Sequence, residues 1–340
     1  MYHSNVFQAR FGSFVRSSSA SVRPTAYISK RLDPNGSSED WAATCGLNFE
    51  YKSSIIKYDC HLDGVQDHNT VNYDKTKVIY RSDNGTPITH VSDRFQPTQP
   101  IEVIDLYQRL CKSNHFQMES LGCLKGGRAI WGLARTELKG STMGQDQQQA
   151  YVLLHTPNDG TGSFMIKLIN RSLACDNMLN ATLQGKFDVD KRLPYLYKIQ
   201  HSSVPNFDQI GRELEALPEY YNSFLERIDQ LANTPINTED MVKYFISLYG
   251  DKYDQVSSAT KKHVDKLMCL VLDAPGQELR ARRGSVYGAL SAVTNYYDHI
   301  VSSKSSHLCD ATENRFASSN FGNGERIKNK AFTNALEMVS

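Results

Sequence analysis

Apolar residues change their spacing near residue 203, and this change limits the possible folds more than any other feature. Before it, apolar and polar residues alternate, as between Arg128 and Leu138, which is typical of half-buried β-strands. After it, apolar residues recur every three or four positions, which is typical of amphipathic helices. Strands followed by helices predict an α+β fold. We expect an antiparallel sheet in the N-terminal half, packed with helices, and a mostly helical C-terminal half.

Turn signals divide the strand-rich half into smaller units. Asn84-Gly85 joins two apolar runs, and both residues tolerate the positive φ of a tight turn, so we expect a β-hairpin there. The apolar spacing over 101–111 predicts a helix, and we also expect a helix over 171–183. The segment 140–149 is rich in Gly, Ser and Gln and predicts an exposed loop.

The longest helical pattern is an apolar seam of almost four heptads. Its members are Phe207, Ile210, Leu214, Leu217, Tyr221, Phe224, Ile228 and Leu231. Pro218 interrupts the seam, so we expect a kink or two helices end to end. Such a seam can be a dimerisation surface, or it can pack against the chain's own sheet. Further helices are expected over 239–250, 257–272, 286–301 and 325–338.

The formal charge of +1 hides an uneven distribution along the chain. Residues 121–201 carry a charge of +4, whereas residues 202–278 carry −6. Near-neutrality argues against a protein that coats nucleic acid by bulk charge, although the basic segments can converge into one patch.

Composition and pattern together predict three parts. Residues 1–40 form a flexible basic N-terminal arm, residues 41–200 an α+β sheet domain, and residues 201–340 a helical region packed on it. Residues 1–31 hold five basic residues and no acidic one. Such a start also fits a mitochondrial transit peptide, but an arm that docks on a partner is the interpretation we favour.

The seven cysteines are scattered and lack the pairing of a disulfide framework or a zinc site. They predict free thiols in a reducing compartment, hence a cytoplasmic protein. No apolar run approaches the ~18 residues that a membrane-spanning helix needs. We therefore expect a soluble chain with no membrane contact and no metal or other cofactor.

Two basic residues flank two glycines at the start of a predicted strand, in the run Lys125-Gly126-Gly127-Arg128. Glycine lets a backbone approach phosphate closely, and the flanking charges would hold the phosphate in place. The alternative is a turn that needs positive φ, with solvated bases on either side. Arg135 lies further along the same strand and is a further candidate phosphate contact.

Arginines also stand at two expected helix starts. Arg171 begins the helix expected over 171–183, and Arg282 and Arg283 precede Ser285, another expected helix start. The free amide groups of a helix start favour an anion, and arginine matches phosphate with paired hydrogen bonds. The alternative is that these arginines are simply solvated.

Tyrosines and a histidine near these bases have two interpretations each. Tyr195 and Tyr197, beside Lys198, are expected in an exposed loop, where their rings could stack on unpaired bases. The pair Asp298-His299 could have a catalytic role, but the sequence has no second cluster of metal ligands or acid–base residues at a fixed spacing, such as HExxH. A structural histidine is the interpretation we favour.

Several runs of the sequence resemble one family, the phage- and plasmid-like proteins of domain of unknown function 932. The runs are Glu119 to Trp131, His155 to Gly162, Arg171 to Leu179, Arg283 to His299, and Phe321 to Gly324. The resemblance covers about residues 40–340. It implies a setting in mobile genetic elements and no mechanism. The order of strands and helices is also loosely similar to that of single-strand annealing proteins of phage recombination.

These observations favour a non-enzymatic protein of a phage or mobile element that interacts with single-stranded nucleic acid. It could be an oligomeric single-strand annealing or recombination accessory protein. Its expected contacts are Lys125, Gly126, Gly127, Arg128, Arg135, Arg171, Arg282 and Arg283. The alternative is a virion-associated or host-interaction structural protein that assembles through its N-terminal arm and helical seam.

Overall fold

The alternating residues of the N-terminal half form most of a seven-stranded antiparallel sheet, sheet A. The computed structural model describes residues 30–60, 69–181, 196–200, 207–305 and 309–339. In order of hydrogen bonding, the strands of sheet A are β1 (Lys30–Arg31), β5 (Gln117–Leu124), β6 (Ala129–Thr142), β7 (Asp146–Pro157), β8 (Ser163–Ser172) and β10 (Tyr197–Gln200), and β9 (Met178–Asn180) also pairs with β8. Strands β5 to β8 follow one another as hairpins, so the middle of the sheet is a meander.

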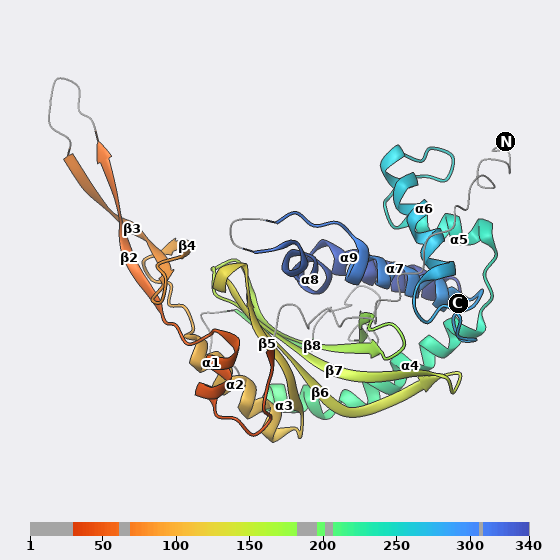
Figure 1. Cartoon of the computed structure of the whole chain (residues 1–340), viewed down its shortest axis with the longest axis horizontal. Coiled ribbons are helices and arrows are strands. Elements are labelled where there is room, and N and C mark those ends of the chain that lie inside the picture. The colour runs from red at the N-terminus through yellow and green to blue at the C-terminus, as the bar shows by residue number, and fades with distance from the viewer. Residues whose placement is uncertain (1–29, 61–68, 182–195, 201–206, 306–308, 340) are drawn as a thin grey trace.

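Helices cover one face of sheet A along the lower side of Figure 1. They are α1 (Ser38–Cys45), α2 (Pro100–Ser113), α3 (Phe207–Glu215) and α4 (Leu217–Asn233). The hydroxyl of Tyr107 in α2 lies 2.9 Å from that of Thr156 in β7. The hydroxyl of Tyr221 in α4 donates to Oδ1 of Asn170 in β8 at 3.1 Å. These buried bonds fix both helices against the same face.

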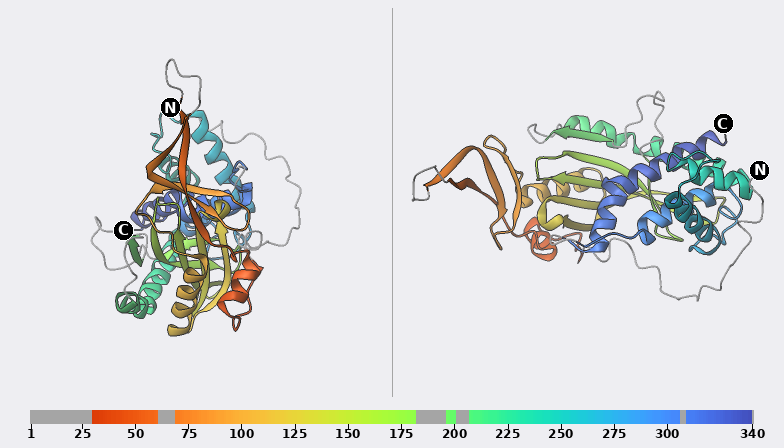
Figure 2. Two further views of the ribbon diagram at one scale, coloured as in Figure 1. Left: turned by 90° about the vertical axis from the view of Figure 1, so that its left-hand side faces the viewer. Right: turned by 90° about the horizontal axis from the view of Figure 1, so that it is seen from above.

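The opposite face of sheet A carries α8 (Ala311–Phe321) and α9 (Asn323–Glu337), as Figures 1 and 2 show. Phe316 of α8 packs on Trp131 of β6 with ring centroids 4.6 Å apart. Lys167 of β8 forms a 2.7 Å ion pair with Glu325 of α9. The sheet is therefore sandwiched. Side chains of successive strand residues point to opposite faces, and nearly all residues of β7 and β8 are buried, so both faces are covered there.

The remaining helices extend the C-terminal layer on one side of the molecule. They are α5 (Thr238–Ser247), α6 (Ser258–Asp273) and α7 (Val286–Asn295), which continues as the π-helix η5 (Tyr296–Ile300). Helix α7 packs at the end of sheet A where β7 begins, since Tyr287 donates to Asp146 at 3.1 Å.

A second sheet, sheet B, contains β2 (Tyr51–Cys60), β3 (Asn69–Arg81) and β4 (Pro87–Ser92). The hairpin of β2 and β3 projects away from the body of the molecule (Figures 1 and 2). Three large apolar side chains on it are exposed, namely Ile55, Tyr58 and Tyr73.

The structure confirms the α+β class, with sheet A formed from the N-terminal half and a mostly helical C-terminal half. It also confirms the Asn84-Gly85 hairpin, which joins β3 to β4, and the helix expected over 101–111, which is α2. The seam forms two successive helices, α3 and α4, and Pro218 lies in the first turn of α4. Its side chains from Ile210 to Leu231 are buried in the core, so the seam packs on the chain's own sheet.

Two local predictions are wrong. Residues 140–149 are not an exposed loop but the paired ends of β6 and β7, and Gln148 and Gln149 are buried there because their amides have internal hydrogen-bond partners. The segment expected as a helix over 171–183 does not begin as one; its described residues, 171–181, include the end of β8, a turn and β9. Helices α1 and α8 were not expected. Residues 1–29, most of the expected N-terminal arm, lie outside the described residues.

Candidate functional site

The turn between β5 and β6 is the 3-10 segment η2 (Lys125–Gly127). Lys125, Gly126 and Gly127 all have positive φ, at 52°, 69° and 109°. A Cβ on Gly127 would also lie 3.2 Å from the ring of Phe49. Both the backbone conformation and the close packing therefore favour glycine at this position, as expected for a tight turn.

One amide of this turn already holds an internal anion. The backbone N–H of Lys125 donates to the carboxylate of Glu313 in α8. Burial raises the pKa of Glu313 above its ordinary value, and the Lys125 N–H partly opposes that rise. The turn thus attracts an oxyanion, but the chain itself occupies this amide. A ligand would contact the basic side chains on either side.

A groove of about 930 Å³ lies beside this turn. The turn from β7 to β8, strand β10 and the junction of α8 and α9 supply its other walls. Its charged and aromatic lining residues include Phe95, Lys125, Arg128, His155, Asp159, Lys198 and Phe321. Three of the sequence motifs, 119–131, 155–162 and 321–324, therefore meet in one place although they lie far apart in the chain.

Basic side chains outnumber acidic ones among the described lining residues. Lys125 and Lys198 are exposed, and the half-buried Arg128 has a buried Nε with no hydrogen-bond partner among the described residues. The lining carboxylate, Asp159, accepts hydrogen bonds from the N–H and hydroxyl of Thr161 at 3.1 and 2.5 Å. The groove consequently favours an anionic ligand.

Aromatic rings and a helix start complete the groove. Phe321 is half-buried and stacks on His155 with ring centroids 4.0 Å apart. Helix α9 begins at Asn323 in the groove wall, with Gly322 as its N-cap residue, and the N–H of Gly324 donates to the hydroxyl of Ser318 at 3.2 Å. The partial positive charge of that helix end adds to the field of the basic side chains.

The two strand arginines of the predicted site lie outside this groove. Arg171 is not at a helix start; it lies in β8, is buried, and forms a 2.6 Å ion pair with Asp176. Arg135 is half-exposed in β6, with its Nε 3.4 Å from Glu119 and an Nη donating to Gln117. Both side chains are engaged by partners within the chain.

The last two predicted arginines lie at the other end of β7 from the groove. Ser285 is the N-cap of α7, so the expected helix start is confirmed. Arg282, however, is only 1% exposed, and its Nη2 lies 2.6 Å from Asp146 at the start of β7. Arg283 is exposed. The groove lies beside Pro157, the last residue of β7, so these arginines do not join it.

Of the eight predicted residues, Lys125 and Arg128 line the groove on either side of Gly126 and Gly127, and the other four lie outside it. Sequence reasoning did not assign the α8–α9 junction to the site, although the motif Phe321 to Gly324 had been recognised. Lys198 is exposed as expected, but it lies in strand β10, whereas Tyr197 is buried there; Tyr195 lies outside the described residues.

The pair Asp298-His299 lies outside the groove, with Asp298 buried and His299 half-buried. Asp298 forms a 2.7 Å ion pair with Lys328 of α9 and accepts a hydrogen bond from the Met178 N–H of β9. These contacts give Asp298 a structural role, whereas the buried Nε2 of His299 has no hydrogen-bond partner among the described residues, so the structural role of the histidine stays a prediction. Within the described ranges, no group of three or more His, Cys, Asp or Glu side chains could hold a metal ion. Nor is any described helix long and apolar enough to cross a bilayer.

Comparison with known proteins gives one result. The model of the family described as "Domain of unknown function (DUF932)" matches residues 87–319, from the first residue of β4 into α8. The chain belongs to this family. The matched residues include most of the groove lining, with Lys125, Arg128 and Asp159, but not α9 or the β2–β3 hairpin. No curated protein and no solved structure matches the chain.

Proposed function

We propose that this DUF932 protein binds single-stranded nucleic acid in the groove beside the double-glycine turn. The observation that carries the proposal is the meeting of three separate motif segments around a basic groove with exposed Lys125 and Lys198. Single-strand binding needs positive charge along the backbone and ring faces for the bases. The groove offers the first through Lys125, Arg128 and Lys198, and the second through Phe95 and Phe321.

The proposed role is that of a non-enzymatic accessory protein in single-strand annealing or recombination, acting as a homo-oligomer in the cytoplasm of a cell that carries a phage or mobile element. The absence of a disulfide among the described cysteines is compatible with a reducing compartment. Phosphate contact is now assigned to the groove residues alone. Arg135, Arg171 and Arg282 are left out because internal partners engage them.

Fluorescence anisotropy with a labelled single-stranded oligonucleotide tests the proposal. The double variant Lys125→Gln/Arg128→Gln should weaken binding and should reduce the slope of log K against log salt by about 1.4, because each lost phosphate contact on a single strand removes about 0.7. The matched control is Arg280→Gln/Arg283→Gln, which removes the same charge at exposed positions outside the groove.

The control variant should bind like the parent chain. Absence of binding by the parent chain at low salt would refute the proposal. Equal weakening by the groove variant and the control would show that binding depends on overall charge and not on the groove.

The alternative function is structural assembly, which was expected to use the N-terminal arm and the helical seam. In the structure the β2–β3 hairpin is the better candidate surface for it. The helical seam is buried in the chain's own core, whereas Ile55, Tyr58 and Tyr73 on the β2–β3 hairpin are exposed. Size-exclusion chromatography with light scattering on the triple variant Ile55→Ser/Tyr58→Ser/Tyr73→Ser tests this alternative. Loss of an oligomer by the variant, together with no oligonucleotide binding by the parent chain, would favour assembly as the function.

A further inference from the structure

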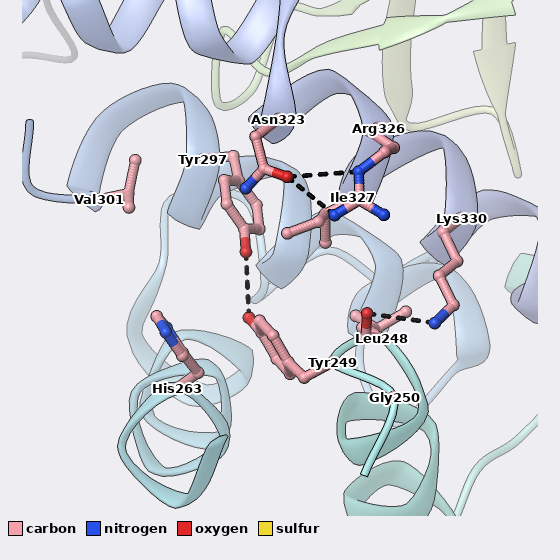
Figure 3. Close-up of a pocket in the computed structure, with 10 residues that line it drawn as sticks. All are labelled: Leu248, Tyr249, Gly250, His263, Tyr297, Val301, Asn323, Arg326, Ile327 and Lys330. Carbon is pink, nitrogen blue, oxygen red and sulfur yellow. Dashed lines mark hydrogen bonds between the residues drawn. The ribbon is translucent and has the colours of Figure 1, made fainter. Parts of the chain in front are cut away.

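A second cavity of about 450 Å³ lies among α5, α6, the π-helix and α9, and it shares Asn323 with the lining of the groove (Figure 3). The turn that follows α5 contributes Leu248, Tyr249 and Gly250, and α6 contributes His263. The π-helix contributes Tyr297, and α9 contributes Arg326 and Lys330. The cavity is on the scale of small-molecule sites, which begin at about 300 Å³.

The charged side chains that line this cavity are cations. Arg326 and Lys330 lie four residues apart on α9 and therefore on the same helix face. Arg326 is exposed and donates to Oδ1 of Asn323 at 2.9 and 3.3 Å. Lys330 donates to the carbonyls of Ser247 and Leu248 at 2.6 and 3.2 Å. No carboxylate of the described residues pairs with either cation, so their charge stays available to a ligand.

Those bonds also fix the two cations in place. Asn323 accepts from the guanidinium of Arg326, and the carbonyl of Leu248 accepts from the ammonium of Lys330, as Figure 3 shows. A site whose side chains are already oriented loses less conformational entropy when a ligand binds.

Hydroxyl and imidazole groups line the side of the cavity facing the cations. The hydroxyls of Tyr249 and Tyr297 lie 3.2 Å apart, and His263 stacks on Tyr249 with ring centroids 4.7 Å apart. Burial raises the pKa of both tyrosines, so both keep their protons. One hydroxyl donates to the other, which leaves one O–H to donate to a ligand.

The π-helix explains why these rings meet. It carries Tyr296 and Tyr297. The hydroxyl of Tyr296 lies 3.0 Å from Nδ1 of His263, and the hydroxyl of Tyr297 is hydrogen-bonded to that of Tyr249. A π-turn widens the helix and shifts the following side chains, and such turns are frequent at functional sites.

We propose that this cavity binds the phosphate of a phosphate monoester, with the phosphate between Arg326 and Lys330 and the organic part beside Tyr249. A phosphate dianion matches two adjacent cations, and the guanidinium offers paired donors to its oxygens. The ligand is either a free mononucleotide or the 5′-phosphate of a strand, since both present the same group. The site is independent of the groove function, as it uses different charged side chains.

Isothermal titration calorimetry at low salt with adenosine 5′-monophosphate, adenosine and inorganic phosphate tests the site on the full chain. The monophosphate should bind saturably, inorganic phosphate more weakly, and adenosine not measurably. Arg326→Gln should weaken binding of the monophosphate by at least about tenfold, since the substitution removes a charge-assisted hydrogen bond. Arg280→Gln, which removes the same charge from an exposed position outside the cavity, should leave affinity unchanged.

A pair of oligonucleotides with and without a 5′-phosphate identifies the source of the phosphate. A preference for the phosphorylated strand that Arg326→Gln abolishes assigns the site to strand ends, and equal binding of both strands with tight monophosphate binding assigns it to free nucleotides. The proposal is overturned if millimolar monophosphate and the phosphorylated strand show no Arg326-dependent binding. The Lys125→Gln/Arg128→Gln variant, which removes two basic side chains from the groove, should still bind the monophosphate. Each proposal can therefore be refuted without refuting the other.

Discussion

Replacing Asp146 with asparagine should destabilise this protein strongly, because it leaves the guanidinium of Arg282 buried without a counter-charge. Arg282 is 1% exposed and Asp146 is fully buried, and the guanidinium contacts the carboxylate through Nε at 2.7 Å and Nη2 at 2.6 Å. Tyr287 also donates to this carboxylate, at 3.1 Å. The asparagine variant keeps the shape of the side chain and removes only its charge.

Loss of one partner of a buried ion pair typically costs about 3–5 kcal/mol. For a chain of 340 residues, with an unfolding entropy of about 2 cal/mol/K per residue, this corresponds to a drop of roughly 4–7 °C in Tm. Thermal unfolding followed by circular dichroism measures the change. The double variant Asp146→Leu/Arg282→Met should recover most of the loss, since it buries no charge.

The comparison with Arg283 separates a structural arginine from a ligand contact. Arg283 is exposed, so Arg283→Gln should change stability by no more than about 0.5 kcal/mol. Unfolding of Asp146→Asn at the parent temperature would refute the structural role of the buried ion pair. An Arg282→Met variant that keeps full stability and weakens oligonucleotide binding would also refute it, because Arg282 would then act on the ligand.

Two further predictions concern packing and pH. Gly288→Ala should lower the free energy of unfolding by about 1–3 kcal/mol, because a Cβ there would lie 1.9 Å from the carbonyl oxygen of Arg282. Gly211→Ala is the control: a Cβ there meets open space in α3, so the variant should be as stable as the parent or more stable in urea unfolding. Burial lowers the pKa of His299, and the charge of Asp298 partly opposes that shift. The unfolded chain therefore binds a proton at this histidine at a higher pH than the folded chain does. Stability should fall as pH drops below about 6.5, the ordinary pKa of histidine. His299→Gln should reduce that fall between pH 7 and 5, and an unchanged pH dependence of the urea midpoint would contradict this assignment.

Local sequence was sufficient for the features that depend on neighbouring residues. The Asn84-Gly85 turn, the N-cap at Ser285 and the separation of α3 from α4 were all predicted. Each depends on a backbone conformation that a few adjacent residues prefer. The change in apolar spacing gave the α+β class for the same reason, since periodicity shows which face of an element is buried.

The candidate site was predicted in part. The positive-φ turn at Lys125 to Gly127 follows from its glycines, but its neighbours in the groove come from β7, β10 and the α8–α9 junction. The polar run 140–149 looked like a loop because its glutamines suggested exposure. In the folded chain Gln148 bonds Tyr287, 139 residues away, and is buried.

The order of the elements, the tight turns and the basic residues that a ligand could use follow from the amino-acid sequence alone. Which of those basic residues face solvent depends on contacts between distant parts of the folded chain. Arg282 and its carboxylate partner, Asp146, are 136 residues apart, and nothing in either local sequence indicates the pairing. A buried charge requires a partner of opposite charge, and folding of the whole chain places that partner.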